Sequence, residues 1–233
     1  LDLVIDGVLF GAFFHAGQYC ESGTRCFVAE SHSAELIERL VARADRLQLG
    51  DPLDFATDLG PLIHAAQRER VEGYIALGQS EGAELVYGGE RPSAPSLAAG
   101  AYIQPTIFGN VNNQMRLAQE EIFGPVLSVI PYQTVSEAII LANESIYGLA
   151  GAVWSRDLQA AIEVARRLRA GTVWINDHHL INALAPFGGY KQSGSGRELG
   201  HYGLLEYTEA KHIHVDLMQK RQGKLWWDAL LPE

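Results

Sequence analysis

The stretch VLSVIPYQTVSEAIILANESIYGLAGAVWSRDLQAAIEVARRLRAGTVWIN, residues 126–176, decides the fold. Its apolar patterning predicts strands and helices in strict alternation: a strand at Val126–Tyr132, a helix at Thr134–Asn143, a strand at Gly151–Trp154, a helix at Leu158–Arg169 and a strand at Thr172–Asn176. This order is typical of right-handed parallel crossovers. We therefore expect an α/β fold, a layered domain with a mostly parallel sheet flanked by helices.

The residues upstream continue the same kind of pattern. The apolar spacing predicts, in order, a helix from Leu1 to about Gly17, a strand at Cys26–Ala29, a helix with Ser33 as N-cap that runs to Ala44, a helix at His64–Ser80, and strands at Glu84–Tyr87 and Ile103–Phe108. The Pro- and Ser-rich stretch Arg91–Gly100 indicates a surface loop.

The last part of the chain has a different character. Phe187–Gly203 is rich in glycine and irregular, Lys211–Val215 has the pattern of a strand, and Trp226 and Trp227 follow in a tail. Exposed tryptophans favour an arm that another surface covers. We expect a catalytic domain over residues 1–192, and a return segment with an oligomerisation arm over residues 193–233.

Composition limits the classes of function. The 233 residues are 47% hydrophobic, 20% charged and carry a net charge of −10. This charge argues against nucleic acid and against an anionic membrane surface as partners. Two cysteines favour a reducing compartment, so the expected location is cytoplasmic. No run of about 18 apolar residues indicates a membrane span.

The sequence FHAGQYCESGTR, residues 14–25, places a thiol in a polar turn between a buried helix and a strand. A cysteine in such a turn can form a thiolate, and nearby backbone N–H groups can face a developing oxyanion. The alternative is an ordinary half-buried cysteine, which composition alone favours about two to one. Cys26 falls on the following strand and is expected to serve packing.

Two further motifs say little by themselves. QEEIFGPV, residues 119–126, is compatible with a solvated acidic turn. APFGGYKQSGSGRELG, residues 185–200, is compatible with a structural glycine loop. Its glycine spacing does not fit a dinucleotide fingerprint, and no clear strand–turn–helix unit surrounds it.

Together the three motifs resemble the signatures of aldehyde dehydrogenases, in the family's order and over nearly the whole chain. The resemblance implies that Cys20 is the nucleophile, that Glu121 contacts the nicotinamide ribose, and that Phe123 packs near the nicotinamide ring. Glu198 matches a glutamate on the water and proton path. The family's pocket positions match Tyr19, Glu21, Ile181 and Phe187. Glu21 beside the nucleophile would favour a cationic aldehyde by Coulomb attraction.

The implied reaction is oxidation of an aldehyde to a carboxylic acid with NAD or NADP, through a thiohemiacetal and a thioester on the cysteine. The family's N-terminal dinucleotide-binding domain, its asparagine oxyanion donor and its deacylating glutamate are expected upstream of Leu1. Activity is therefore expected to need that missing half, in cis or in trans. Tyr207–Leu217 matches the strand arm through which family members pair, so a homo-oligomer, a dimer or tetramer, is expected.

Three other functions are weighed against this one. A metal site is disfavoured, because His178 and His179 would point to opposite faces of a strand, and His212 and His214 lack a third ligand. A non-catalytic oligomerisation remnant of a dehydrogenase is one rival. A cysteine-dependent thioester hydrolase or acyl transferase is another.

Overall fold

A four-stranded mixed sheet forms the centre of the computed structural model, which describes residues 2–217, 220–221, 224 and 226–231. The strands are β1 (Arg25–Ala29), β4 (Val126–Tyr132), β3 (Thr106–Gly109) and β2 (Glu84–Tyr87), in that spatial order. β1 and β3 each run parallel to β4, and β2 pairs antiparallel with β3 at one edge. The expected α/β fold is present, with one antiparallel edge strand on a parallel core.

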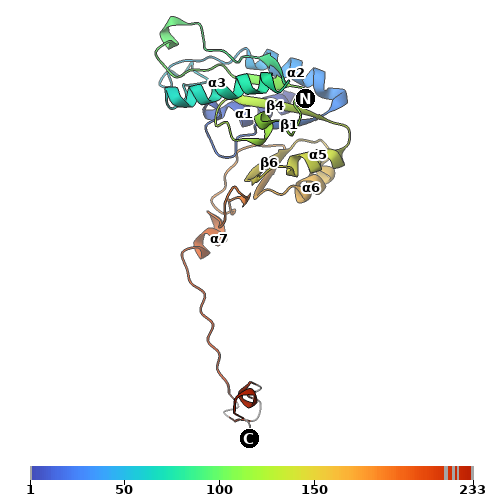
Figure 1. The fold of residues 1–233 in the computed structure, drawn as a ribbon, viewed down its shortest axis with the longest axis vertical. Helices are drawn as coiled ribbons and strands as arrows, with labels where there is room; N and C mark the ends of the chain where they lie inside the picture. The colour runs from blue at the N-terminus through green and yellow to red at the C-terminus, as the bar shows by residue number, and fades with distance from the viewer. Residues whose placement is uncertain (1, 218–219, 222–223, 225, 232–233) are drawn as a thin grey trace.

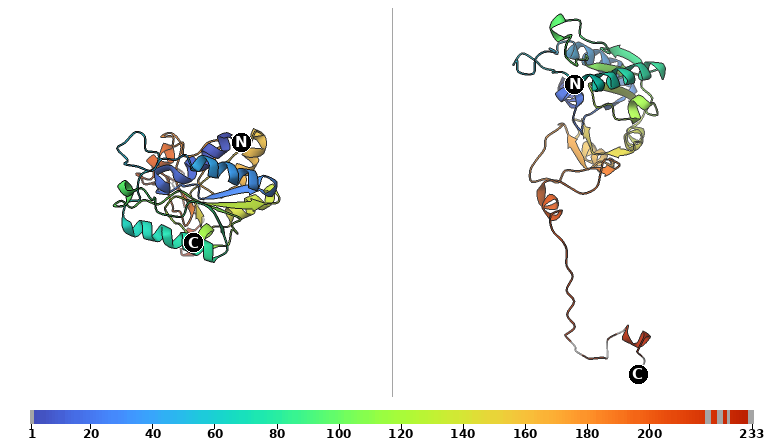
Figure 2. Two further views of the ribbon diagram at one scale, coloured as in Figure 1. Left: turned by 90° about the horizontal axis from the view of Figure 1, so that it is seen from above. Right: turned by 60° about the vertical axis from the view of Figure 1, so that its left-hand side comes forward.

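Helices cover both faces of this sheet (Figures 1 and 2). α1 (Asp2–Phe13) packs on α2 (Glu30–Ala44), and α3 (Ala65–Ser80) lies on the opposite side. α2 turns Leu36, Leu40 and Ala44 into the core, as its i, i+4, i+8 spacing requires. Each large aliphatic side chain buried in this way contributes about 1.5–3 kcal/mol.

A smaller layer lies beside the sheet and contains the second half of the alternating stretch. β6 (Ala150–Val153) and β7 (Thr172–Ile175) form a parallel pair connected by α6 (Leu158–Arg167). This crossover confirms the expected strand–helix–strand unit. α5 (Val135–Asn143) leads into this layer, yet β6 pairs with β7 and not with the four-stranded sheet.

Several expected boundaries were wrong. α2 begins at Glu30 with Ala29 as N-cap, because β1 runs into the helix without a loop, so Ser33 lies inside its first turns. β3 begins at Thr106, not at residue 103, because Gln104 donates its N–H to Glu90 and Pro105 has none to donate. Short elements were not predicted: η2 (Pro95–Leu97), α4 (Arg116–Gln119), and the antiparallel pair β5 (Tyr147–Gly148) and β8 (Tyr190–Lys191).

Beyond α7 (Gly200–Leu205) the chain leaves the body as an extended segment (Figure 1). The strand expected at Lys211–Val215 was wrong for this single chain, since these residues pair with no other strand among those described. A strand needs a hydrogen-bonding edge, and the segment lies away from every sheet. Trp226 is 85% exposed and precedes a short 3-10 helix, η3 (Trp227–Ala229). Within the described residues, no helix has both the length and the apolar character needed to cross a membrane.

Candidate active site

A strained turn carries Cys20 (the Cys20 turn, residues 14–25). After α1 ends, His15, Ala16 and Gly17 adopt positive φ values of 50°, 55° and 70°. A Cβ on Gly17 would lie 2.2 Å from the carbonyl oxygen of Gly124, so only glycine allows the two backbones to approach this closely. Strain of this kind persists only where the surrounding structure fixes it. This close approach of Gly17 to Gly124 therefore fixes the position of the Cys20 turn against the second motif, residues 119–126.

Side-chain contacts tie the Cys20 turn to its surroundings. Gln18 accepts a hydrogen bond at 2.9 Å from the N–H of Ile63. The Tyr19 hydroxyl donates to the carbonyl of Gly11, and the N–H of Gly23 donates to the same carbonyl at 2.6 Å. Burial raises the pKa of Tyr19, so its phenol stays neutral. The Cys20 turn is thus held against the end of α1.

The Cys20 thiol reaches solvent and donates a hydrogen bond of 2.8 Å to Oε2 of Glu21. Burial, the hydrogen bond to Glu21 and the charge of Glu21 together raise the pKa of Cys20 to about 11. Backbone N–H groups of Cys20 and Glu21 act in the opposite direction and favour the thiolate. Cys20 is therefore accessible, but its raised pKa keeps the thiol protonated near neutral pH.

Glu21 is buried, with 7% of the residue exposed. Its Oε1 lies 2.6 Å from Nδ1 of His179, and its carbonyl oxygen lies 3.1 Å from Nε2 of His178. Burial lowers the pKa of His178 below its usual value, so this ring is neutral. The two histidines therefore contact Glu21 from the loop after β7, one at its side chain and one at its backbone.

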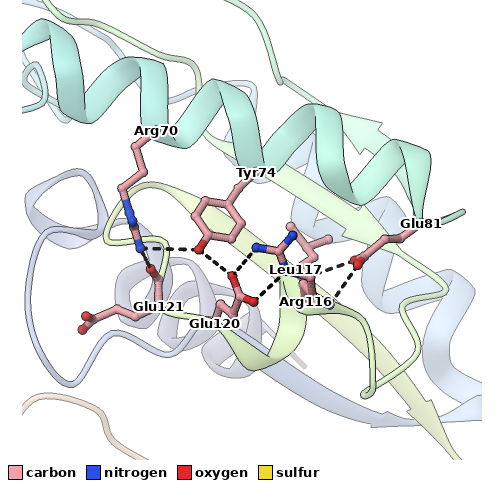
Figure 3. A network of polar contacts seen from close by, with 7 residues as sticks. All are labelled: Arg70, Tyr74, Glu81, Arg116, Leu117, Glu120 and Glu121. Atoms are coloured by element: carbon pink, nitrogen blue, oxygen red, sulfur yellow. Dashed lines mark hydrogen bonds and ion pairs between the residues drawn. The ribbon is translucent and has the colours of Figure 1, made fainter.

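The second motif forms the opposite wall (the Glu121 loop, residues 120–124), and α3 holds its backbone from behind. Gln67 donates to the carbonyls of Ile122 and Phe123 at 3.0 and 2.8 Å. Arg70 donates to the carbonyl of Glu121 at 2.5 Å. Figure 3 shows the Glu121 side chain directed away from Arg70.

A polar network at the start of the Glu121 loop fixes it to α3 and α4 (Figure 3). Arg116 forms an ion pair of 2.6 Å with Glu120, and Tyr74 donates to the same carboxylate at 2.8 Å. The hydrogen bonds from Arg116 and Tyr74 lower the pKa of Glu120 to about 2. The Glu120 carboxylate is therefore engaged by Arg116 and Tyr74, whereas the side chain of its neighbour Glu121 is exposed and available to a ligand.

One open cleft of about 430 Å³ joins the two walls. Five of the expected site residues line it: Tyr19, Cys20, Glu21, Glu121 and Phe123. Phe123 is 38% exposed, so its ring is available in the cleft. Another part of the lining comes from the smaller layer and the segments that lead into it, including Asn143, Gly148 and Leu168. The structure therefore places a thiol, a free carboxylate and an aromatic ring around one space.

Three expected site residues lie outside the lining of this cleft. Phe187 and Glu198 form an isolated antiparallel bridge with N–H to carbonyl distances of 2.8 and 2.7 Å. Glu198 is exposed, and Ile181 is 41% exposed in the loop after β7. Their roles stay predictions. The residues that the sequence did not indicate are His179, Gln67 and Arg70, because each acts through contacts between distant segments.

Comparisons with known proteins identify the family of the chain. The Aldehyde dehydrogenase family matches residues 1–213. The chain is 52% identical over 214 residues to betaine aldehyde dehydrogenase of Bacillus subtilis strain 168, covering 92% of this chain and 44% of that protein. It is 46% identical over 220 residues to the human mitochondrial aldehyde dehydrogenase, covering 94% of this chain and 42% of that protein.

A solved structure is also similar. The crystal structure of betaine aldehyde dehydrogenase from Staphylococcus aureus in complex with NAD+ superposes with a TM-score of 0.89 at 47% identity, covering 91% of this chain and 42% of that one. The chain thus spans less than half the length of these relatives. On the match over residues 1–213, the chain belongs to the aldehyde dehydrogenase family.

Proposed function

We propose that the chain is the catalytic part of an NAD(P)-dependent aldehyde dehydrogenase that oxidises an aldehyde to a carboxylic acid, with Cys20 as the nucleophile. The observation that carries this proposal is the shared cleft, in which Cys20 faces the same space as Glu121 and Phe123. A thioester hydrolase would need the cysteine but not this second wall. A remnant without catalysis would need neither.

In the proposed mechanism the Cys20 thiolate attacks the aldehyde carbon, and its lost proton goes to solvent or to a nearby base. The backbone N–H of Cys20 is one donor for the resulting oxyanion. The thiohemiacetal carbon then loses a hydride, that is hydrogen with its bonding electron pair, to the acceptor that a bound nicotinamide would supply, and the oxyanion electrons re-form the carbonyl of a thioester on Cys20. Water cleaves the thioester, so the acid leaves and the thiol is restored. Glu198 is proposed to serve the proton path.

The residues of the Glu121 loop fit a nicotinamide nucleotide. Its backbone is held by α3. The exposed carboxylate of Glu121 is suited to accept hydrogen bonds from ribose hydroxyls, and the Phe123 ring to pack on a flat ring. The bound cofactor supplies the hydride acceptor, and the protein supplies binding and orientation. NAD accords with the NAD+ complex of the S. aureus relative, and the choice between NAD and NADP is part of the test.

The substrate class is proposed as an apolar or mid-sized aldehyde, with Tyr19, Ile181 and Phe187 as pocket residues. The names of two relatives suggest betaine aldehyde as a cationic candidate. The expectation that Glu21 attracts such a cation directly has little support, because its side chain is 5% exposed and already contacts His179 and Cys20. If a Glu21→Gln variant leaves the preference for aminoaldehydes over neutral aldehydes unchanged, Glu21 has no such role.

Activity is proposed to need the cofactor-binding half that the relatives carry, in cis or in trans, and a homo-oligomer that pairs through Tyr207–Leu217. The experiment mixes the 233-residue chain with that half and follows NAD(P)H absorbance over a panel of aldehydes. We expect reduced cofactor to form only in the mixture. Acid formation without reduced cofactor would favour the hydrolase, and full activity from the lone chain would contradict the need for a second half.

A further inference from the structure

A buried carboxylate beside a nucleophilic thiol is an unusual arrangement, because the negative charge opposes thiolate formation. Cys20 Sγ and Glu21 Oε2 are 2.8 Å apart, and 5% of the Glu21 side chain is exposed. A buried anion is costly unless an opposite charge lies close to it. Among the described residues, His179 is the one in ion-pair contact with Glu21, at 2.6 Å.

The surroundings of His179 suit a positively charged ring. The centroids of Phe14 and Tyr19 each lie 5.2 Å from that of His179, and the centroid of Phe10 lies 6.3 Å away. Aromatic faces attract cations over such distances. The other groups around Glu21 carry no positive charge, since burial keeps His178 neutral and Tyr19 is a neutral phenol. Asp177 lies near His178 and adds negative charge.

We propose that His179 is a positioning residue for the nucleophile: its imidazolium neutralises Glu21, so that the reactivity of Cys20 depends on the proton held by His179. With His179 protonated, the Cys20 thiolate forms beside a pair of zero net charge, and the thiol proton goes to solvent. With His179 neutral, the same thiolate would face an unmatched carboxylate. The proposal deepens the function proposed above, because it concerns the same cysteine.

The test measures the rate at which iodoacetamide alkylates Cys20 in the full 233-residue chain, by peptide mass spectrometry between about pH 6 and pH 9. Glu21→Gln removes the opposing charge, so alkylation should become about tenfold faster near neutral pH, which is the change in thiolate fraction for one unit of pKa. His179→Asn should slow alkylation about fivefold, because Glu21 then keeps its full effect on the thiol.

The double variant separates this coupling from a general disturbance. In the Glu21→Gln background, His179→Asn should change the rate less than about twofold, because no carboxylate is left to neutralise. An equal slowing in both backgrounds would overturn the proposal, as would a His179→Asn rate equal to wild type. The pH profile of the wild type should rise less steeply than a single ionisation and become steeper in Glu21→Gln.

Two controls keep the result interpretable. His15→Asn makes the same change in the Cys20 turn, where the His15 ring stacks on Phe14 and not on Glu21, so its rate should match wild type. Cys26 packs against the core, so alkylation of Cys26 reports unfolding. If Cys26 reacts in the His179→Asn variant, the measurement is repeated with His179→Gln. Alkylation needs no aldehyde and no cofactor, so the expected rates without aldehyde oxidation would reject the proposed function and leave the His179 coupling intact.

Discussion

The two walls of the cleft differ in how they are prepared for chemistry. In the Cys20 turn the ionisable groups are coupled to one another, with Glu21 buried between Cys20 and His179. In the Glu121 loop, α3 contacts the backbone of residues 121–123, and the side chains of Glu121 and Phe123 are left exposed, although Glu120 is paired with Arg116 and Tyr74. In the proposed function, the Cys20 turn determines the reactivity of the thiol and the Glu121 loop binds the cofactor.

This difference separates the effects that substitutions should have. Changes in the Cys20 turn should alter the chemical step and the pH dependence of the thiol. Changes behind the Glu121 loop should alter cofactor binding and leave the thiol as it was. Substitutions in each wall test this separation.

Replacing the nucleophile should have the largest effect. Cys20→Ser, assayed together with the cofactor-binding half, should lower kcat by about a thousandfold or more, because a serine hydroxyl is far less nucleophilic without a base. Cys26→Ala is the matched control, since this thiol packs against the core on β1. It should leave kcat near the wild-type value. Equal losses in both variants would remove Cys20 from its assigned role.

Substituting Gly17, where its backbone closely approaches Gly124, should have the next largest effect. Gly17→Ala would bring a methyl group 2.2 Å from the Gly124 carbonyl oxygen at a φ of 70°. We expect the free energy of unfolding to fall by about 2 kcal/mol or more. Gly73→Ala on α3 is the control, because its Cβ would meet nothing within 4 Å, and it should stabilise by up to about 1 kcal/mol. Urea unfolding of both variants measures the difference in their free energies of unfolding. Equal values would show that the backbone can accommodate a side chain where Gly17 approaches Gly124.

Loosening the Glu121 loop should have a smaller effect. Gln67→Met removes two hydrogen bonds to the carbonyls of Ile122 and Phe123 while keeping the length of the side chain. We expect KM for the cofactor to rise about fivefold to tenfold, since one net hydrogen bond is worth about 1 kcal/mol. The rate of Cys20 alkylation should not change. Gln79→Met, at an exposed position on the same helix, is the control. A changed alkylation rate would show that the two walls are not separable.

The smallest effect concerns acid stability. The folded-state pKa of Glu120 is lowered from 4.5 to about 2 by its hydrogen bonds to Arg116 and Tyr74. A lowered pKa stabilises the fold above about pH 4.5, and this contribution is lost as the pH falls through about 2. The difference in unfolding midpoint between wild type and Glu120→Gln should therefore be constant above that range and shrink below it. A difference that persists at about pH 2 would contradict the assignment.

The alternation of strands and helices in residues 126–176 predicted the fold class well, because periodicity reports which face of an element is buried. It predicted β6–α6–β7 but not that β6 leaves the central sheet, since strand pairing depends on edges that a local pattern does not contain. The strand at Lys211–Val215 failed for the same reason. It has the pattern of a strand, and the single chain offers it no edge.

The candidate site was predictable where one residue carries the chemistry. Cys20, Glu121 and Phe123 were indicated by the resemblance of short motifs to the family, and they line one cleft. Gln67 and His179 could not, because a glutamine on a helix and a histidine in a loop have no local signature. Their roles arise from contacts with the Glu121 loop and with Glu21, which only the fold brings together.

In the proposed function, Cys20 becomes bonded to the substrate carbon in a cleft shared with the nicotinamide ring. The most direct measurement is peptide mass spectrometry of the reconstituted enzyme, quenched in acid during turnover with an aldehyde and NAD+. We predict an acyl group on the peptide that contains Cys20, which appears only when NAD+ is present and disappears in Cys20→Ser. Turnover with no acyl group on that peptide, or an acyl group that forms without NAD+, would contradict the account.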